Sequence, residues 1–135
     1  MKKLIIVRGI PGSGKSTHAK ELQKELNAAH WEADMFFMKD GKYNWNPRLA
    51  HIAHMWCFKK VFKSFEDHDT VIVSNTFLNP SDMKQYITEA QKLGIEVEVH
   101  RMTNEFQNVH GVPEERLQEM KNKLRDYPGE ILYHA

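Results

Sequence analysis

One short motif constrains the fold of this chain more than any other stretch. Residues 9–17 read Gly-Ile-Pro-Gly-Ser-Gly-Lys-Ser-Thr and match the pattern G-x-x-x-x-G-K-[ST] at every defined position. The apolar run at residues 4–7 precedes the motif and is typical of a strand buried on both faces of a parallel sheet. The motif therefore predicts a buried strand, a glycine-rich loop and a helix in direct succession.

The residue types in this motif suit a chain of phosphate groups. Glycines let backbone N–H groups surround an anion, and the helix that follows adds its positive end. Lys15 can reach the β- and γ-phosphates, and the Ser16 hydroxyl can bind Mg²⁺. A turn that binds nothing would need neither side chain, so we expect ATP and Mg²⁺ as cofactors. The expected nucleotide contacts are Gly9, Pro11, Gly12, Ser13, Gly14, Lys15, Ser16 and Thr17.

Length and composition narrow the remaining possibilities. At 135 residues the chain can form one domain with a hydrophobic core, and we expect a single domain over residues 1–135. A net charge of +1 gives no global attraction to nucleic acid. Cys57 is the only cysteine, which excludes an internal disulfide. The apolar runs are too short for a membrane span or a signal peptide, so we expect a cytoplasmic protein without a membrane partner.

Strand and helix patterns alternate along the chain. Alternation with right-handed crossovers predicts a P-loop NTPase fold of class α/β, with three layers (α/β/α) and a parallel sheet of about four to five strands. The expected strands cover residues 3–8, 30–33, 70–74 and 95–100, and the expected helices cover residues 16–27, 47–67, 80–93 and 113–125. Helical spacing places Leu26, Ile52 and Leu93 on inward faces. Residues 35–46 are expected to form a loop, and residues 130–135 have no assignment.

Ligands of such a sheet bind at the carboxyl ends of its strands, where Asp34, Asn75 and Arg101 are expected. Asp34 is a candidate catalytic base that accepts the proton of an acceptor hydroxyl; its alternative role is a helix cap or turn residue. Asn75 is a candidate for orienting a substrate or a water on Mg²⁺, and capping a turn is an equally good interpretation.

The aspartate that usually ends the third strand of a P-loop protein and supports the metal is missing here. Ser74 and Asn75 occupy its place, and both are uncharged. We therefore expect Mg²⁺ to be held less firmly and Asp34 to share the metal site. His51, His54 and Cys57 could suggest zinc, but their spacing leads around a helix and no second cluster completes four ligands.

The stretch after Asp34 is unusually aromatic. Its rings alternate with cations and could stack on a nucleobase while holding backbone phosphates; closing the core over the sheet edge is the alternative role. Phe36 and Arg48 are the tentative substrate contacts, and an acceptor that contains a nucleobase is favoured. The rings are Phe36, Phe37, Tyr43 and Trp45, and the cations are Lys39, Lys42 and Arg48.

Three blocks of sequence together resemble a known family. Residues 9–17, 34–37 and 71–80 are similar to the 5′-kinase domain of the polynucleotide kinase of T-even phages. Residues 34–47 and 108–113 resemble still more the related small P-loop ATPases often labelled AAA-type. The likeness covers almost the whole chain, and its specificity comes from the blocks after the loop motif.

The resemblance implies transfer of the γ-phosphate of ATP to a 5′-hydroxyl of DNA or RNA. By this resemblance Asp34 matches the general base, and Lys15 and Ser16 match the phosphate and metal contacts. Asn75 falls where the phage kinase has an aspartate.

Gln107 occupies the place of the family's lid arginine, and the lid looks shortened. Loss of that cation removes a group expected to stabilise the transition state, for which Arg101 or Arg116 could compensate. Three hypotheses follow: a polynucleotide-type kinase, a kinase for a nucleoside or other small metabolite, and a nucleotide-binding protein with little turnover. The acceptor is thus expected to be a nucleic acid or a nucleoside, and the oligomeric state is left open.

Overall fold

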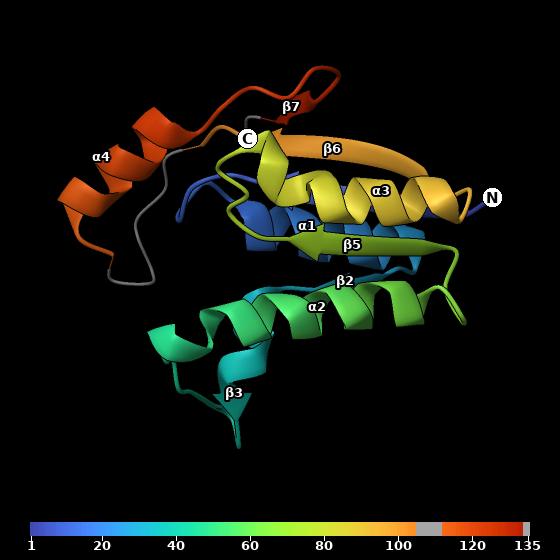
Figure 1. Ribbon diagram of the computed structural model, residues 1–135, viewed down its shortest axis with the longest axis horizontal. Helices are drawn as coiled ribbons and strands as arrows, with labels where there is room; N and C mark the ends of the chain where they lie inside the picture. The colour runs from blue at the N-terminus through green and yellow to red at the C-terminus, as the bar shows by residue number, and fades with distance from the viewer. Residues whose placement is uncertain (105–111, 134–135) are drawn as a thin grey trace.

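The computed structural model describes residues 1–104 and 112–133, which form one parallel sheet with helices on both faces (Figure 1). The strand order is β2-β5-β1-β6-β7, so the strand before the loop motif lies in the centre. The α/β fold and the parallel sheet of five strands are as predicted. The strands are β1 (Lys3–Arg8), β2 (Ala29–Trp31), β5 (Thr70–Ser74), β6 (Glu96–Met102) and β7 (Ile131–Tyr133), and the α-helices are α1 (Lys15–Leu26), α2 (Ala50–Ser64), α3 (Lys84–Lys92) and α4 (Glu114–Lys123).

The central strand β1 is buried on both faces of the sheet. Leu4 and Ile6 belong to the larger core cluster, which also contains residues of α2 and α3. Ile5 and Val7 belong to a smaller cluster with Ala19 of α1. The side chains of a strand alternate between faces, so the continuous aliphatic run is what a strand between two helical layers requires.

Asparagine caps begin the two helical segments that lead into α2 and α3. The Asn46 side chain accepts a hydrogen bond from the Arg48 N–H at 3.0 Å and precedes a 3₁₀ turn, η2 (Pro47–Leu49), that leads into α2. Asn79 forms a capping box with Asp82 at the start of η3 (Pro80–Met83), which leads into α3. Both predicted helix starts are confirmed, and in each the first turn is a 3₁₀ helix.

Several local predictions are wrong. The stretch at 35–46 is not one loop: it contains most of the 3₁₀ helix η1 (Ala33–Phe37) and a hairpin of β3 (Met38–Lys39) and β4 (Lys42–Tyr43). Three residues predicted on inward helix faces are exposed: Ile52 is 48% exposed, Leu93 is 56% exposed, and Leu26 is also exposed. A helix that covers a sheet buries only a narrow stripe, and these side chains lie beside that stripe.

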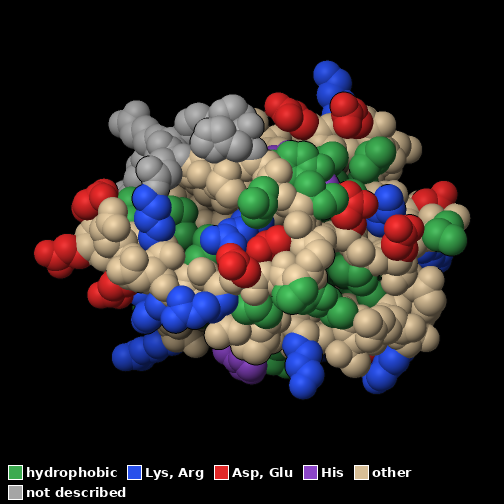
Figure 2. Space-filling model, turned by 90° about the horizontal axis from the view of Figure 1, so that it is seen from above, with side chains coloured by type: hydrophobic (Ala, Val, Ile, Leu, Met, Phe, Trp, Pro, Cys, Tyr) green, Lys and Arg blue, Asp and Glu red, His purple; other side chains and the backbone are tan. Residues whose placement is uncertain are grey.

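Charges of both signs are interspersed on the face shown in Figure 2, in agreement with a net charge of +1. Among the described helices, none combines the length and the apolar character that a membrane crossing needs.

Candidate functional site

The glycine-rich loop lies between the carboxyl end of β1 and the start of α1. Gly14 is the N-cap of α1 with a φ of 95°, a left-handed conformation that glycine adopts without strain. A Cβ atom on Gly9 would lie 2.4 Å from the Ser13 Oγ and 3.1 Å from the Met102 carbonyl oxygen, so a side chain at this position would have to displace the Ser13 hydroxyl. The Ser13 Oγ is buried and lacks a hydrogen-bond partner within the described part of the chain. The loop therefore has the close backbone path that a phosphate-binding turn needs.

Lys15 begins α1 and is partly buried. The Nζ donates a hydrogen bond to the Ile10 carbonyl oxygen at 3.0 Å. Burial lowers the pKa of Lys15 to about 8, although the Glu32 and Asp34 carboxylates oppose this shift. A cation that loses this much hydration is suited to binding an anion.

Ser16 faces a carboxylate that the sequence analysis did not identify. The Ser16 Oγ lies 3.3 Å from one Glu32 carboxylate oxygen and 3.4 Å from the other. Burial raises the pKa of Glu32, and the Ser16 hydrogen bond opposes this shift. Hydroxyl and carboxylate oxygens are the ligands that Mg²⁺ prefers, so the chemistry of these two side chains fits the metal expected at Ser16.

Asp34 lies in η1, directly after β2, and its side chain is exposed. The Tyr43 hydroxyl of the hairpin donates a hydrogen bond to the Asp34 Oδ1 at 3.2 Å. Burial, helped by the Asp34 charge, raises the pKa of Tyr43 to about 12, so this hydroxyl stays protonated and remains a donor. Asp34 is thus tied to the hairpin and also open to solvent.

A cavity of about 590 Å³ joins these groups. Lys15, Ser16, Glu32 and Asp34 line it together with Tyr43 and Trp45 of the aromatic stretch. The loop motif, the tip of β2 and the hairpin therefore share one cleft.

Asn75 lies at the carboxyl end of β5 and is buried. Its Oδ1 accepts a hydrogen bond from the Ala33 backbone N–H at 2.9 Å, and its Nδ2 lies 3.9 Å from the Cys57 Sγ. Asn75 also lines the cavity. Its amide therefore joins β5 to the segment that carries Glu32 and Asp34.

The two tentative substrate contacts lie away from the cavity lining. Phe36 packs on the core with its ring 5.8 Å from that of Trp56, and the exposed Arg48 belongs to η2. Tyr43 and Trp45 line the cavity in their place, and Trp45 is 58% exposed. Their proximity to Asp34 depends on the hairpin, which the sequence pattern did not reveal.

The arginines named as possible substitutes for the lid cation differ in position. Arg101 of β6 bonds to Asp126 and to Glu130, whereas Arg116 of α4 lines the cavity. Gln107 lies outside the described residues. Within the described residues, no group of three His, Cys, Asp or Glu side chains could hold a metal ion, and His54 lines the cavity as a single histidine.

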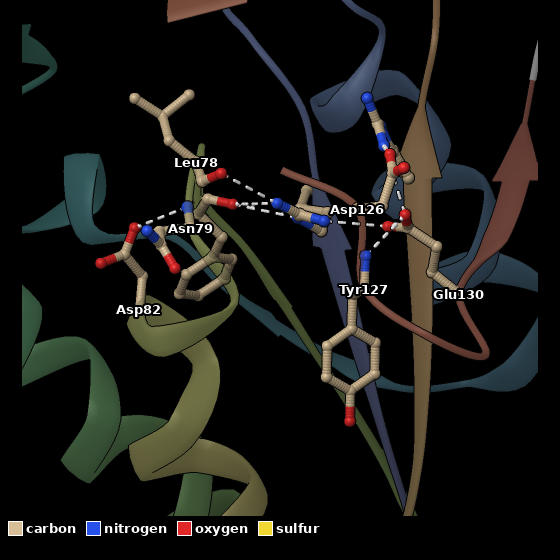
Figure 3. A network of polar contacts seen from close by, with 9 residues as sticks. Leu78, Asn79, Asp82, Asp126, Tyr127 and Glu130 are labelled. Atoms are coloured by element: carbon tan, nitrogen blue, oxygen red, sulfur yellow. Dashed lines mark hydrogen bonds and ion pairs between the residues drawn. The ribbon is translucent and has the colours of Figure 1, made fainter. Parts of the chain in front are cut away.

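The strand directly before the loop is anchored by a buried cation. The Arg8 guanidinium donates to the Phe77 carbonyl oxygen, to the Leu78 carbonyl oxygen and to the Glu130 carboxylate (Figure 3). Glu130 also accepts a hydrogen bond from the Tyr127 backbone N–H. This network joins the end of β1 to the loop after β5 and to the C-terminal segment.

The sheet order and the glycine-rich loop between β1 and α1 define a P-loop protein of class α/β. The family model described as "AAA domain" matches residues 4–119, and the chain belongs to this family.

Two relatives extend this comparison. The chain is 31% identical over 142 residues to the uncharacterized protein PM0531 of Pasteurella multocida (strain Pm70), an alignment that covers 95% of the chain and 79% of the relative. It is 29% identical over 128 residues to human NEDD4-binding protein 2, which covers 87% of the chain and only 7% of that protein.

Three solved structures share the fold at low sequence identity. A sugar kinase from Janibacter sp. HTCC2649 is 16% identical with a TM-score of 0.67, over 100% of this chain and 85% of that one. Chaetomium thermophilum Kti12 in complex with ADP-AlF3 is 13% identical with a TM-score of 0.67, over 98% and 88%. The Pnkp1/Rnl/Hen1 RNA repair complex contains a chain that is 21% identical with a TM-score of 0.62, over 95% and 40%.

Proposed function

We propose that this protein is an ATP- and Mg²⁺-dependent phosphotransferase that phosphorylates a 5′-hydroxyl of nucleic acid. The observation that carries the proposal is that Lys15, Ser16 and Asp34 line one cavity. In the proposed step the acceptor oxygen bonds to the γ-phosphorus, the bond from that phosphorus to the β–γ bridging oxygen breaks, and the acceptor proton passes to Asp34.

Each of the chain's own groups has a defined task in this step. The loop N–H groups and Lys15 hold the phosphates, and Lys15 stabilises the charge that moves to the leaving oxygen. Ser16 would hold Mg²⁺, which when bound neutralises phosphate charge. Asp34 orients the acceptor hydroxyl and takes its proton, while Tyr43 fixes the position of the carboxylate.

The wall opposite the loop supports an acceptor with a nucleobase. Tyr43 and Trp45 present half-exposed rings to the cavity, and stacking on such rings tolerates any base. Lys39 and Lys42 face each other across the hairpin. Like charges in this position repel each other, and a backbone phosphate would offset the repulsion.

A kinase for a nucleoside or another small metabolite is the second candidate, because a sugar kinase shares the fold over the whole chain. A nucleotide-binding protein with little turnover is the third, because Gln107 occupies the place of the lid arginine.

The test is transfer from γ-labelled ATP to a panel of acceptors: 5′-hydroxyl DNA and RNA oligonucleotides, free nucleosides and simple sugars. We expect the oligonucleotides to be labelled. Asp34→Asn should lower kcat at least 100-fold, in line with the loss of a general base. Asp40→Asn is the matched control, because Asp40 is exposed at the hairpin turn, and it should leave transfer unchanged.

The other outcomes separate the hypotheses. Labelling confined to nucleosides or sugars favours the second candidate, and transfer that survives Asp34→Asn removes Asp34 as the base. Tight ATP binding without transfer supports the third, and activity gained in Gln107→Arg would then identify a weakened kinase.

A further inference from the structure

The end of β5 lacks an acidic residue, but the Glu32 carboxylate contacts Ser16 from the end of another strand. The side chains at that end, Ser74 and Asn75, carry no charge, yet the metal expected at Ser16 needs a carboxylate nearby. Glu32 follows β2, which lies directly beside β5 in the sheet. A carboxylate from the neighbouring strand thus reaches the loop serine.

Two uncharged residues, Ser74 at the end of β5 and Asn75 directly after it, hold the segment that carries this carboxylate. The Ser74 hydroxyl lies 2.8 Å from the His30 Nε2, which lies 3.5 Å from a Glu32 carboxylate oxygen. The Asn75 side chain accepts a hydrogen bond from the backbone N–H of Ala33, the residue after Glu32. Glu32 therefore lies between two residues, His30 and Ala33, that hydrogen bonds attach to the end of the strand that ordinarily provides the acid.

The spacing suits a shared cation. Two adjacent ligands of an octahedral Mg²⁺ ion are about 2.9 Å apart, since each lies about 2.05 Å from the metal. The Ser16 hydroxyl and the Glu32 carboxylate are 3.3 Å apart, a distance that a small side-chain movement would close. The Glu32 side chain is 19% exposed, so its charge is only partly screened by solvent.

We propose that Glu32 supplies the carboxylate of the Mg²⁺ site of the bound nucleotide, in place of an acid at the end of β5. This inference rests on the proposed function only as far as binding of Mg²⁺ with a nucleotide. It removes the metal from the tasks of Asp34, so the two neighbouring carboxylates divide the work: Glu32 serves the metal and Asp34 serves the acceptor hydroxyl.

The test measures metal binding rather than turnover. ATP is titrated by calorimetry at a series of Mg²⁺ concentrations, and Mn²⁺ binding in the presence of ADP is followed by electron paramagnetic resonance. In Glu32→Gln the midpoint Mg²⁺ concentration should rise about ten-fold and Mn²⁺ binding should weaken equally. Glu25→Gln, on the exposed face of α1, is the matched control and should change neither quantity.

Two further variants make the test independent of folding defects. Glu32→Asp keeps the charge on a shorter side chain and should give an intermediate midpoint. In the double variant Glu32→Gln/Asn75→Asp a carboxylate returns to the end of β5, where it can still accept the Ala33 N–H, and the midpoint should return toward that of the wild type.

Failure of this inference differs from failure of the proposed function. A midpoint that is unchanged in Glu32→Gln overturns the role of Glu32, even if transfer to an oligonucleotide is found. A ten-fold shift in a protein that phosphorylates none of the acceptors confirms Glu32 and overturns the proposed function.

Discussion

Arg8 and Glu130 form a buried ion pair, with the Arg8 Nη1 2.9 Å from the Glu130 Oε1 and side chains that are 0% and 7% exposed. They lie 122 positions apart in the chain. Arg8 immediately precedes Gly9, the first residue of the loop motif. The C-terminal segment therefore fixes the strand end from which the phosphate-binding loop starts (Figure 3).

Removing one partner of this pair should destabilise the protein strongly. Glu130→Ala leaves the buried Arg8 charge uncompensated, and we expect the free energy of unfolding to fall by about 3 kcal/mol. Urea unfolding followed by circular dichroism measures this change. Glu119→Ala breaks the exposed pair with Arg116 and should cost less than about 0.5 kcal/mol. Equal losses in the two variants would contradict the importance of burial.

Replacing both partners should cost less than replacing one. The double variant Arg8→Met/Glu130→Leu removes the charges together and fills a similar volume, and this kind of exchange is often neutral. We expect it to be more stable than Glu130→Ala in the same urea experiment. A double variant that is less stable would show that the hydrogen bonds from Arg8 to the carbonyl oxygens after β5 dominate the network.

The sequence predicted the central part of the fold better than its periphery. The predicted strands 3–8 and 70–74 coincide with β1 and β5, because strands buried on both faces need continuous aliphatic runs. The sequence does not predict β7, because a strand of three residues that pairs with a single neighbour carries almost no pattern. Helical spacing predicts Leu93 on an inward face, but the residue is exposed, because spacing identifies a helix face only approximately.

The candidate site also contains residues that the sequence predicts and a residue that it does not. The loop motif is local in sequence, so Lys15 and Ser16 could be named from it. Glu32 could not be named, because its link to Ser16 spans 16 positions and depends on how β2 is aligned with the loop. A signal was nevertheless present: Glu32 is the other acid at the tip of β2, two residues before Asp34.

Asn75 should contribute to stability through a backbone group. Asn75→Ala leaves the buried Ala33 N–H without its acceptor, which should lower the free energy of unfolding by about 2 kcal/mol. Chemical denaturation followed by tryptophan fluorescence measures the loss. Asn44→Ala, at an exposed position of the hairpin end, is the control and should change stability by less than about 0.5 kcal/mol. A loss of similar size in both variants would contradict the importance of the hydrogen bond from the Ala33 N–H to Asn75.

Glu98 should make stability depend on pH. A hydrogen bond to His100 is the main cause that lowers the pKa of Glu98, and Lys3 adds to the shift. A carboxyl group with a lowered pKa stabilises the fold above its unfolded pKa of about 4.5, and this stabilisation is lost as the pH falls through the folded pKa. Glu98→Gln should therefore cost about 1 kcal/mol at pH 7 and much less at pH 3. Urea unfolding at the two pH values tests this difference, and Glu66→Gln, at an exposed position, should show none.

Gly9→Ala should disturb the loop by steric contact. The added methyl group would lie 2.4 Å from the Ser13 Oγ and 3.1 Å from the Met102 carbonyl oxygen, at a φ of +155° that side chains rarely adopt, so contact and backbone strain together should cost about 2 kcal/mol in stability and weaken ATP binding. Gly94→Ala is the control: its φ of +69° adds about 1 kcal/mol of strain, but no atom lies within 4 Å, and ATP affinity should not change. Calorimetry and thermal unfolding measure both effects. If the contact with Ser13 is the cause, Gly9→Ala should cost less in a Ser13→Ala background, because the Oγ that the methyl group meets is then gone.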